Sequence, residues 1–453
     1  MPALDNLFRY IDEKFNGYIP EYQRLVQQPS ISAQHKGIDK CAEMVKDYAI
    51  KAGIKNAQIV PIEGGHPVVY GEIKSKSSKK TLILYAHYDV QPPEPFEEWK
   101  SDPFSAEIRD GRLWGRGASD DKSGTFAAIK AAEAYLNATG DVPVNLKFVF
   151  EGEEEIGSPN LPKFIQAYKE KLSADGAFIL DGSLDISGRP VIDLGVKGIV
   201  YIELRAKGAS KDVHSSRAPI IPSPVWRLVW ALNTLKDKNE KIKIEGFYEK
   251  VRKPTKEEVN LLKKLPFDEK KILAEYGLKN FLRGLSGSQL KKTYFFEPTC
   301  NICGIEGGYT GLGAKTVLPH EAFAKIDFRL VPDMEAEEVL SKTKKHLNKM
   351  GFGDIDVVSI SGYPPARISV NEQISKASIE AARKVYGVAP IVYPTVTGSA
   401  PNYVFVRNLN TPAIGTGCGD PNSNAHAPNE SITVDLIKTG IKYAVALIYA
   451  FSK

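Results

Sequence analysis

The sequence predicts an α/β protein in which helices flank a largely parallel sheet and a second, α+β domain is inserted. Three observations lead to this prediction. The chain has 453 residues, more than the roughly 250–300 that one hydrophobic core usually supports. Strand and helix patterns alternate over about the first 200 residues, as in parallel sheets whose strands are joined by helices. The alternation stops near Gly198 and returns after Tyr363-Pro364-Pro365.

In the first region, amphipathic stretches predict helices, and nearly continuous apolar runs predict strands of a sheet covered on both faces. Helices are expected over Asp5–Val26, Gly37–Lys51, Ser123–Leu136 and Leu161–Leu172. Strands are expected over Pro67–Ile73, Lys80–Val90, Asn145–Glu151 and Gly176–Asp181. The first helix contains Pro20, which favours a break near that residue.

The middle region has a different pattern, in which strands and helices do not alternate strictly. Strands are expected over Ile199–Ala206, Thr299–Ile305 and Phe323–Leu330, and helices over Pro222–Thr234, Lys236–Lys292 and Ala336–Lys349. The stretch Lys236–Lys292 is rich in lysine, but Glu and Asp are interspersed in it, so we interpret it as a solvated surface. We therefore predict an inserted domain over residues 198–368.

The alternating style returns at the C-terminal end. A helix is expected over Glu372–Tyr386, a strand over Ala413–Thr416 and a final helix over Thr433–Phe451. These elements resemble those of the first region. We therefore predict that residues 1–197 and 369–453 form one domain, which the insertion interrupts.

The composition excludes several classes of protein. The chain has 60 Lys and Arg residues, 55 Asp and Glu residues and a net charge of +5, and because the signs are interleaved no nucleic-acid partner is expected. The longest apolar run, Tyr443–Phe451, is far shorter than the roughly 20 residues of a membrane-spanning helix. Four cysteines are too few for a disulfide scaffold, and the charged N-terminal sequence is unlike a signal peptide. We therefore expect a cytoplasmic protein without a membrane partner.

His87-Tyr88-Asp89 lies at the end of the apolar strand LILYAHYDV. Residues i and i+2 share one face of a strand, so the imidazole and the carboxylate project together. A carboxylate beside a metal-binding His fixes the tautomer of the ring and raises its basicity. The tripeptide alone is weak evidence for a metal site, because a chain of this composition contains about one such match by chance. Its position at the C-terminal end of a buried strand, where α/β folds place their sites, strengthens it.

Further acidic groups stand near the ends of predicted elements. Asp120 precedes the helix expected from Ser123. It either binds a metal, or Ser119 or Asp120 simply caps the helix. Glu151-Gly-Glu153-Glu154-Glu155 ends a buried strand, and such a run is either a solvated loop or a group that binds cations, because clustered carboxylates repel one another. Asp181 ends another strand, where a cap or turn residue is the alternative.

Two histidines stand in predicted loops. His426 lies in Asn424-Ala-His-Ala-Pro-Asn-Glu430, just before the last helix, and His214 lies in Asp212-Val-His-Ser-Ser216 of the insertion. Each is weak alone, because a single loop histidine usually has no special role. The chain has only seven histidines, however, so few places remain for imidazole chemistry.

Together these motifs place histidines and several carboxylates at successive strand ends. Imidazole and carboxylate ligands with little thiol suit Zn²⁺, and less specifically Mn²⁺ or Co²⁺. Five ligands are too many for one tetrahedral catalytic site, and they suit two metal ions that share a carboxylate. The residues therefore predict a site for two divalent cations, with Zn²⁺ preferred.

Nine motifs then occur in an order that is typical of one protein family: AHYDVQPP, LWGRGASDDK, EGEEEIGS, LDGS, DVHSS, GGYTGLGAKTVLP, FRLVP, GSAP and AHAPNE. Over nearly its whole length the chain resembles the dinuclear-zinc metallopeptidases that include carnosine-type dipeptidases, glutamate carboxypeptidases, aminoacylases and succinyl-diaminopimelate desuccinylases. Within this family, three segments are most similar to the cytosolic non-specific and carnosine dipeptidases: QPP after the first ligand, GFYEKVRKPT and FRLVP.

The resemblance implies a role for each predicted metal ligand. His87 and Asp181 would hold one cation, Glu155 and His426 would hold the other, and Asp120 would bridge them. In this family the peptide bond after the bridging Asp is cis.

The resemblance also implies the residues that complete the catalytic machinery. Asp89 would orient His87, and Glu154 would be the general base that passes a proton from water to the leaving amine. His214 would stabilise the oxyanion and would reach the site from the partner subunit, which implies a homodimer. The inserted domain would be ferredoxin-like and would act as lid and dimerisation domain.

Arg329 and Ser399, with the region of Thr316, would bind the terminal carboxylate of the substrate, a task for which Arg is suited as a bidentate donor. Two positions depart from the family pattern. Ser123 replaces a usual Gly, and Ser183 stands where the dipeptidases carry an aromatic residue that helps to receive the substrate amine.

These inferences predict a cytoplasmic two-metal hydrolase that cleaves an amide or peptide bond beside a free carboxylate, most simply a dipeptidase or carboxypeptidase. Its substrate would be a small peptide or an N-acyl amino acid. One alternative is an N-acyl amino acid amidohydrolase of the aminoacylase or desuccinylase type. Another is a metal-free relative that binds peptides or acts as an interaction scaffold. The presence of every ligand type counts against this alternative.

Overall fold

The computed structural model describes residues 4–453, which form two compact units. Unit 1 contains the chain up to Gly195 together with Ile368–Pro394 and Pro401–Lys453. Unit 2 contains Val196–Arg367 and Thr395–Ala400.

The segment Thr395–Ala400 differs from the sequence-based division, which assigned it to the same domain as the C-terminal helix. Two hydrogen bonds explain why it groups with unit 2. The N–H of Lys197 donates to the carbonyl oxygen of Gly398 (2.9 Å), and Nη1 of Arg329 donates to Oγ of Ser399 (2.8 Å). Neither bond is visible in a local sequence pattern.

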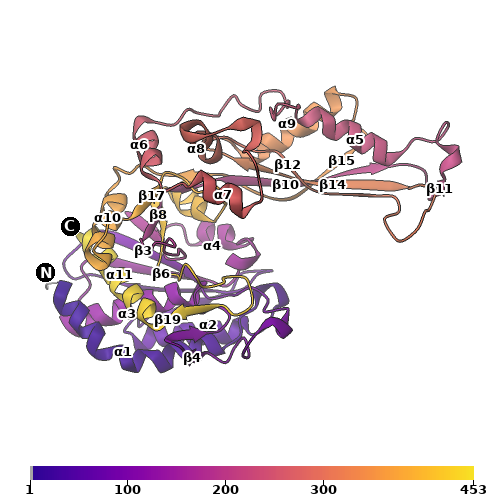
Figure 1. The fold of residues 1–453 in the computed structure, drawn as a ribbon. Coiled ribbons are helices and arrows are strands. Elements are labelled where there is room, and N and C mark those ends of the chain that lie inside the picture. Colours follow the sequence, from indigo (N-terminus) through magenta and orange to yellow (C-terminus); the bar gives the residue numbers. More distant parts are fainter. Residues whose placement is uncertain (1–3) are drawn as a thin grey trace. The chain divides into compact units, whose positions relative to one another are not determined.

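Within residues 4–453, unit 1 is built on an eight-stranded sheet (Figure 1). Its strands in spatial order are β1 (Gln58–Val60), β2 (Val68–Ile73), β6 (Asn145–Glu151), β3 (Thr81–His87), β7 (Gly176–Ile179), β18 (Ala413–Thr416), β8 (Val191–Asp193) and β17 (Ile391–Tyr393). The pairs from β6 to β18 and the pair β8–β17 are parallel, and β1–β2, β2–β6 and β18–β8 are antiparallel. The predicted fold class, with a largely parallel central sheet, is confirmed.

Helices cover both faces of this sheet. One face carries α1 (Leu4–Gln27), α2 (Ile38–Lys51), α3 (Lys122–Thr139), α10 (Gln373–Tyr386) and α11 (Val434–Ser452), which contact one another. The other face carries α4 (Leu161–Ala167) and the helical turn Val404–Asn408, which share an apolar core with alternate residues of the strands. The strands are therefore apolar on both sides, as their sequences predicted.

Helix α1 is continuous, so the break expected at Pro20 is wrong. A proline removes one backbone hydrogen bond, but the buried side chains Leu7, Ile11, Tyr22 and Leu25 recur at helical spacing on both sides of it. Burial of this stripe stabilises both halves of the helix in one direction.

Other elements differ from the predictions in length or were not predicted. Helix α4 ends at Ala167, earlier than the expected Leu172. The short strands β8 and β17 and the strand β15 (Asp356–Tyr363) were not predicted. Strand β15 is largely exposed, so it lacks the buried apolar alternation on which a prediction depends.

Unit 2 contains a four-stranded antiparallel sheet within its described residues. The order along the chain is β10 (Gly198–Lys207), α5 (Pro224–Leu235), β12 (Asn301–Gly307), β14 (Glu321–Leu330), α9 (Ala336–Lys349) and β15, and the order in the sheet is β12-β14-β10-β15. This is the split β-α-β arrangement of ferredoxin-like folds. Helices α5 and α9 pack on the sheet around a core that includes Ile202, Leu204, Ile326 and Phe328.

The lysine-rich stretch of unit 2 forms three short helices in place of one helical stretch. These are α6 (Lys256–Lys264), α7 (Glu269–Glu275) and α8 (Gly287–Phe296). Thr255 and Glu258 form a capping box at the start of α6, which satisfies N–H groups that a helix end leaves free. Pro266 follows α6, where proline opposes helix continuation.

Over the described residues, none of the helices combines the length and apolar character that crossing a bilayer requires.

Candidate active site

The predicted metal ligands of unit 1 gather at one edge of its sheet. His87 is the last residue of β3, Asp181 follows β7 by two residues, and Glu155 lies in the short turn after β6. Because β6, β3 and β7 are adjacent and parallel, their carboxyl ends meet at that edge, where open α/β sheets bind their ligands. Asp120 comes from the loop before α3 and His426 from the loop before β19 (Ser431–Thr433).

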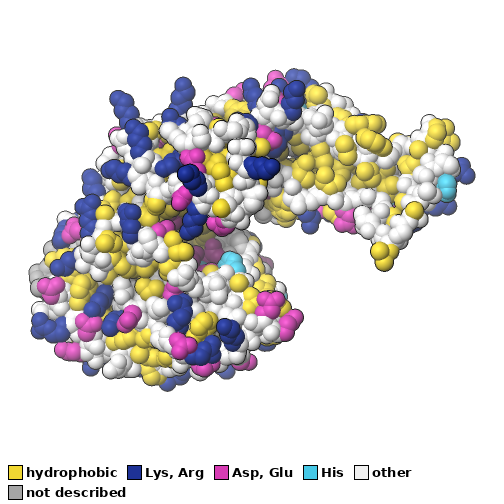
Figure 2. Space-filling model, in the orientation of Figure 1, with side chains coloured by type: hydrophobic (Ala, Val, Ile, Leu, Met, Phe, Trp, Pro, Cys, Tyr) yellow, Lys and Arg dark blue, Asp and Glu magenta, His cyan; other side chains and the backbone are white. Residues whose placement is uncertain are grey.

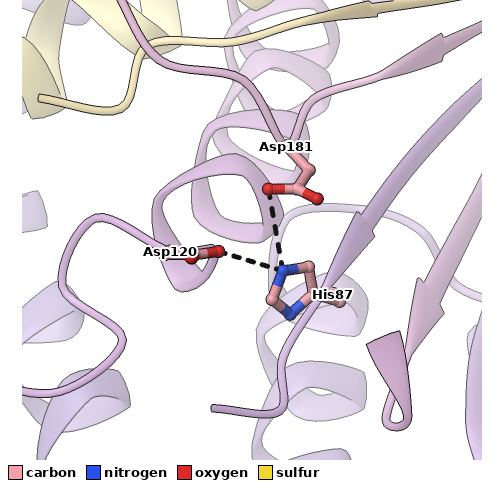
Figure 3. A group of neighbouring side chains, drawn as sticks. All are labelled: His87, Asp120 and Asp181. Carbon is pink, nitrogen blue, oxygen red and sulfur yellow. Dashed lines mark ion pairs between the residues drawn. The ribbon is translucent and has the colours of Figure 1, made fainter. Parts of the chain in front are cut away.

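His87, Asp120 and Asp181 form the first ligand group (Figure 3). Nε2 of His87 lies 3.2 Å from Oδ1 of Asp120 and 3.7 Å from Oδ1 of Asp181. The imidazole is fully buried, and its Nε2 has no hydrogen-bond partner. A buried polar atom of this kind, directed at two carboxylates, fits a ligand to a metal ion.

Asp120, Glu155 and His426 form the second ligand group. Nε2 of His426 lies 2.9 Å from Oδ2 of Asp120 and 3.1 Å from Oε2 of Glu155. Asp120 therefore directs one carboxylate oxygen to each group. Within each group the ligand atoms lie within 4.8 Å of one another, and the set of imidazole and carboxylate ligands suits a divalent cation.

The electrostatics of these groups also fit cation binding. Burial, followed by the charge of Asp181, raises the pKa of Glu154 well above its usual range. Burial also raises the pKa of Asp181 to about 6. Burial disfavours the charged form of His87, but the carboxylates of Asp181 and Asp120 outweigh it and raise the pKa of the imidazole. So many carboxylates repel one another unless protons or cations compensate their charge.

Asp89 connects the two strand ends that carry His87 and Glu155. Its carboxylate accepts the N–H groups of Glu154 (3.2 Å) and Glu155 (3.1 Å). Its Oδ1 also lies 3.3 Å from Nδ1 of His87. Asp89 therefore fixes the imidazole and the acidic turn relative to each other.

Asp121, and neither Asp120 nor Ser119, caps helix α3, because its side chain accepts the N–H of Gly124 (3.1 Å). The simple capping interpretation of Asp120 is therefore wrong, and the Asp120 carboxylate is left to face the histidines. The peptide bond between Asp120 and Asp121 is cis, as the resemblance predicted.

The other predicted residues belong to unit 2 and form two pairs. Nε2 of His214, at the end of β11 (Val213–His214), lies 3.2 Å from Oγ1 of Thr316. Arg329 and Ser399 form the hydrogen-bonded pair described above. Thr316 precedes strand β14, and Arg329 lies near the far end of that strand.

The sequence matches peptidase family M20/M25/M40 over residues 83–450. The chain belongs to this family.

Known relatives within the M20 family agree with the motifs. The Cys-Gly metallodipeptidase dug1 of Schizosaccharomyces pombe is 31% identical, over 97% of this chain and 96% of its own length. A solved M20 family metallo-carboxypeptidase, Sso-CP2 of Sulfolobus solfataricus, is 41% identical with a TM-score of 0.89, and the match covers 95% of this chain and 98% of that one. Human carnosine dipeptidase 1 is 26% identical with a TM-score of 0.78, over 100% of this chain and 99% of that one.

Membership of the M20 family confirms the resemblance found in the sequence and its dipeptidase branch. It also confirms the expected enzyme class, a metal-dependent peptidase. The structure also shows which residues hydrogen-bond to the candidate metal ligands or to the loops that carry them.

Gln91 is a supporting residue that the sequence analysis did not identify. Its Nε2 donates to Oε2 (2.9 Å) and to the carbonyl oxygen (3.1 Å) of Glu155. Glu153, in contrast, turns away from the ligand groups and accepts from the side chain of Asn160 (3.0 Å) and the N–H of His66 (2.8 Å). Adjacent glutamates of the acidic turn therefore have different hydrogen-bond partners. The only sequence signal for the supporting role of Gln91 was its place in the motif AHYDVQPP.

Glu430 is a second supporting residue that the sequence analysis did not identify. Its Oε2 accepts from Nη1 of Arg116 (2.8 Å) and the N–H of Gly117 (3.0 Å). Its Oε1 accepts the N–H groups of Ser119 (2.9 Å) and Asp120 (3.1 Å). The side chains of Arg116 and Glu430 are each only 1% exposed. This buried pair joins the loop that carries Asp120 to the loop that carries His426.

We expect Glu430→Ala to lower both stability and metal affinity. The change would leave Arg116 as an uncompensated buried charge, at a cost of about 3–5 kcal/mol, and would release the loop that carries Asp120, which lowers metal affinity about 10- to 100-fold. Chemical unfolding and metal titration would measure the two effects. The control is Glu380→Ala, which removes an exposed ion pair with Lys453 and should cost less than about 1 kcal/mol. Equal effects of the two changes would contradict the role of Glu430.

Proposed function

We propose that this protein is a two-metal hydrolase that cleaves the peptide bond next to a free C-terminal carboxylate, as a dipeptidase or carboxypeptidase. The observation that carries the proposal is the pair of ligand groups that share Asp120, with Glu154 beside them. The three relatives described above are two dipeptidases and a carboxypeptidase, which supports peptides over N-acyl amino acids as substrates.

The ligands would divide between two divalent cations. His87 and Asp181 would hold one ion, Glu155 and His426 the other, and Asp120 would hold both. Zn²⁺ suits this set best, and Mn²⁺ or Co²⁺ also suit it. When bound, such ions lower the pKa of water towards about 7 and polarise the scissile carbonyl.

Glu154 would act as the general base. Its Oε2 lies 4.0 Å from Nε2 of His87, and its backbone N–H is fixed by Asp89. A carboxylate at this position can take a proton from water and deliver it to the leaving amine.

Arg329 and Ser399 would bind the terminal carboxylate of the substrate. The guanidinium offers planar paired donors that match a carboxylate, and its Nη1 is already oriented by Oγ of Ser399. Exopeptidase specificity would then arise because a bond is cleaved only when a free carboxylate reaches this pair.

His214 and Thr316 would complete the site across a dimer interface, with the partner subunit's His214 stabilising the oxyanion. The surface of unit 2 supports a homodimer. On α5, Trp226 (59% exposed) stacks on Trp230 (54% exposed) with ring centroids 5.8 Å apart. Hydrophobic side chains gather over the part of unit 2 that carries α5 (Figure 2). The edge strand β12 also exposes Ile302 and Ile305, and a second copy would cover such a surface.

The four cysteines of the sequence are all free in the structure, which agrees with a reducing compartment. We therefore propose a cytoplasmic enzyme that acts on small peptides, without a nucleic-acid or membrane partner.

Glu154→Ala should retain both metal ions and lose turnover by about 100- to 10,000-fold, because it removes the general base and none of the ligands. Elemental analysis and dipeptide hydrolysis would measure metal content and rate. Glu153→Ala is the matched control, since that carboxylate faces Asn160 and His66, and it should lose far less activity. Normal turnover in Glu154→Ala would eliminate Glu154 as the base.

A substrate panel tests the proposed bond specificity. We expect the enzyme, loaded in turn with Zn²⁺, Mn²⁺ and Co²⁺, to cleave dipeptides and to leave the matching dipeptide amides nearly untouched, because the amides lack the carboxylate that Arg329 would bind. N-acetyl and N-succinyl amino acids should be poor substrates. Faster cleavage of the N-acyl compounds than of any dipeptide would favour the amidohydrolase alternative.

Mixed dimers test the contribution of the partner subunit. Glu154→Ala and His214→Ala should each be nearly inactive alone, whereas dimers formed by mixing them should recover up to about a quarter of wild-type activity. In a mixed dimer, the His214→Ala chain keeps Glu154 and its partner keeps His214. One of the two sites is therefore complete if the partner subunit's His214 reaches it, and no site is complete if each chain uses its own His214. No recovery after subunit exchange, verified by mass spectrometry, would place His214 in its own chain's site.

A further inference from the structure

Lys197 of unit 2 is a buried cation without an anionic partner. The residue is 2% exposed, and its Nζ donates to the backbone carbonyl oxygens of Tyr294 (2.9 Å) and Glu297 (2.7 Å). Within residues 4–453, no carboxylate oxygen lies within 4.0 Å of its ammonium. Buried lysines are rare unless they are paired, so this one calls for an explanation.

The hydrogen bonds of Lys197 reach both segments that hold the Arg329–Ser399 pair. Its backbone N–H donates to Gly398, the neighbour of Ser399 (2.9 Å). Its ammonium binds the end of α8, just before Thr299. The backbone N–H of Arg329 donates to Oγ1 of Thr299 (3.1 Å), and the N–H of Thr299 donates to the carbonyl oxygen of Arg329 (3.1 Å). Lys197 therefore hydrogen-bonds to both segments whose residues, Thr299 and Ser399, hydrogen-bond to Arg329.

Among the described residues Lys197 has no ion-pair partner, although other charged groups lie near it. Burial lowers the pKa of its ammonium to about 8, with further contributions from the like charges of Arg367 and Arg329, while Glu297 acts in the opposite direction. Arg367 pairs with Glu258 at 2.9 Å, and Nε of Arg329 lies 3.5 Å from Oδ2 of Asp327. Lys197 itself is not compensated, so an arriving carboxylate would gain attraction from it as well as from Arg329.

We propose that Lys197 is a positioning residue for substrate recognition: it aligns Arg329 and Ser399 and adds positive charge behind them, so that the enzyme selects substrates with a free terminal carboxylate. This inference rests on the proposed function, because it requires that Arg329 and Ser399 bind that carboxylate. It differs from a purely structural role in one respect. A structural lysine would affect all substrates alike, whereas this role affects only those that carry the carboxylate.

The first experiment compares Lys197→Met with Lys197→Arg, using a dipeptide and the same dipeptide as its C-terminal amide. Lys197→Met should raise KM for the free acid about 10-fold or more, which corresponds to roughly 1.4 kcal/mol, with little change in kcat. The amide, measured as substrate or as competitive inhibitor, should change less than about twofold. Lys197→Arg keeps the charge and should recover most of the loss.

The second experiment measures KM for the free-acid dipeptide between pH 7 and pH 9.5. A lysine is charged below its pKa, so wild-type KM should rise as the pH passes about 8 and the ammonium loses its proton. Of the charged groups that face Lys197, the Arg329 and Arg367 guanidinium groups do not titrate in this range, and Glu297 is the facing carboxylate. Lys197→Arg should remove the part of the rise that Lys197 causes, and any rise that remains in this variant measures the titration of the substrate amine.

The outcomes separate this inference from the function on which it rests. A wild-type enzyme that cleaves no dipeptide would remove the proposed function and this inference with it. If the wild type cleaves dipeptides but Lys197→Met weakens acid and amide equally, only the role of Lys197 is overturned. If Lys197→Met does not fold, the pH profile of Lys197→Arg decides, and a rise identical to that of the wild type would overturn the inference.

Discussion

The candidate active site depends on one electrostatic constraint: several carboxylates and two imidazoles must be held close together at the carboxyl ends of adjacent parallel strands. Asp120 lies at the centre of this arrangement, with one oxygen 3.2 Å from His87 and the other 2.9 Å from His426. Such a group is unfavourable without compensating charge. The same repulsion makes it a good site for divalent cations, because each cation replaces a repulsion by an attraction.

The protein holds this group in place mainly with backbone N–H donors. Asp89 accepts two of them in the turn that carries Glu154 and Glu155, and Glu430 accepts three in the loop that carries Asp120. Asp89 and Glu430 accept hydrogen bonds from backbone N–H groups, so the side chains of the candidate metal ligands remain available for cations. The outer residues therefore decide where the ligand oxygens lie, which is the usual function of groups around a metal site.

Unit 2 shows a related principle with the opposite charge. Arg329 is oriented by Ser399 and by backbone bonds to Thr299, and Lys197 lies buried behind the same segments. A peptidase that acts beside a free carboxylate needs attraction for metal ions in one part of the chain and for an anion in another. Under the proposed function, unit 1 would bind the metal ions and Arg329 of unit 2 would bind the substrate carboxylate.

Local sequence patterns determined much of the fold. Strands Asn145–Glu151 and Ala413–Thr416 and helix Ala336–Lys349 have the predicted bounds, because their apolar periodicity is strong. The exposed strand β15 and the placement of Thr395–Ala400 were not predictable, because neither is recorded in a buried periodic pattern. At the site, the sequence determined which residue types were available and that they follow strand ends. Only the tertiary structure decided that Glu153 turns away, that Asp121 caps α3 and that Gln91 and Glu430 support the ligands. The physical reason is that these choices depend on hydrogen bonds between residues far apart in the chain, such as Glu430 with Ser119, which local sequence does not encode.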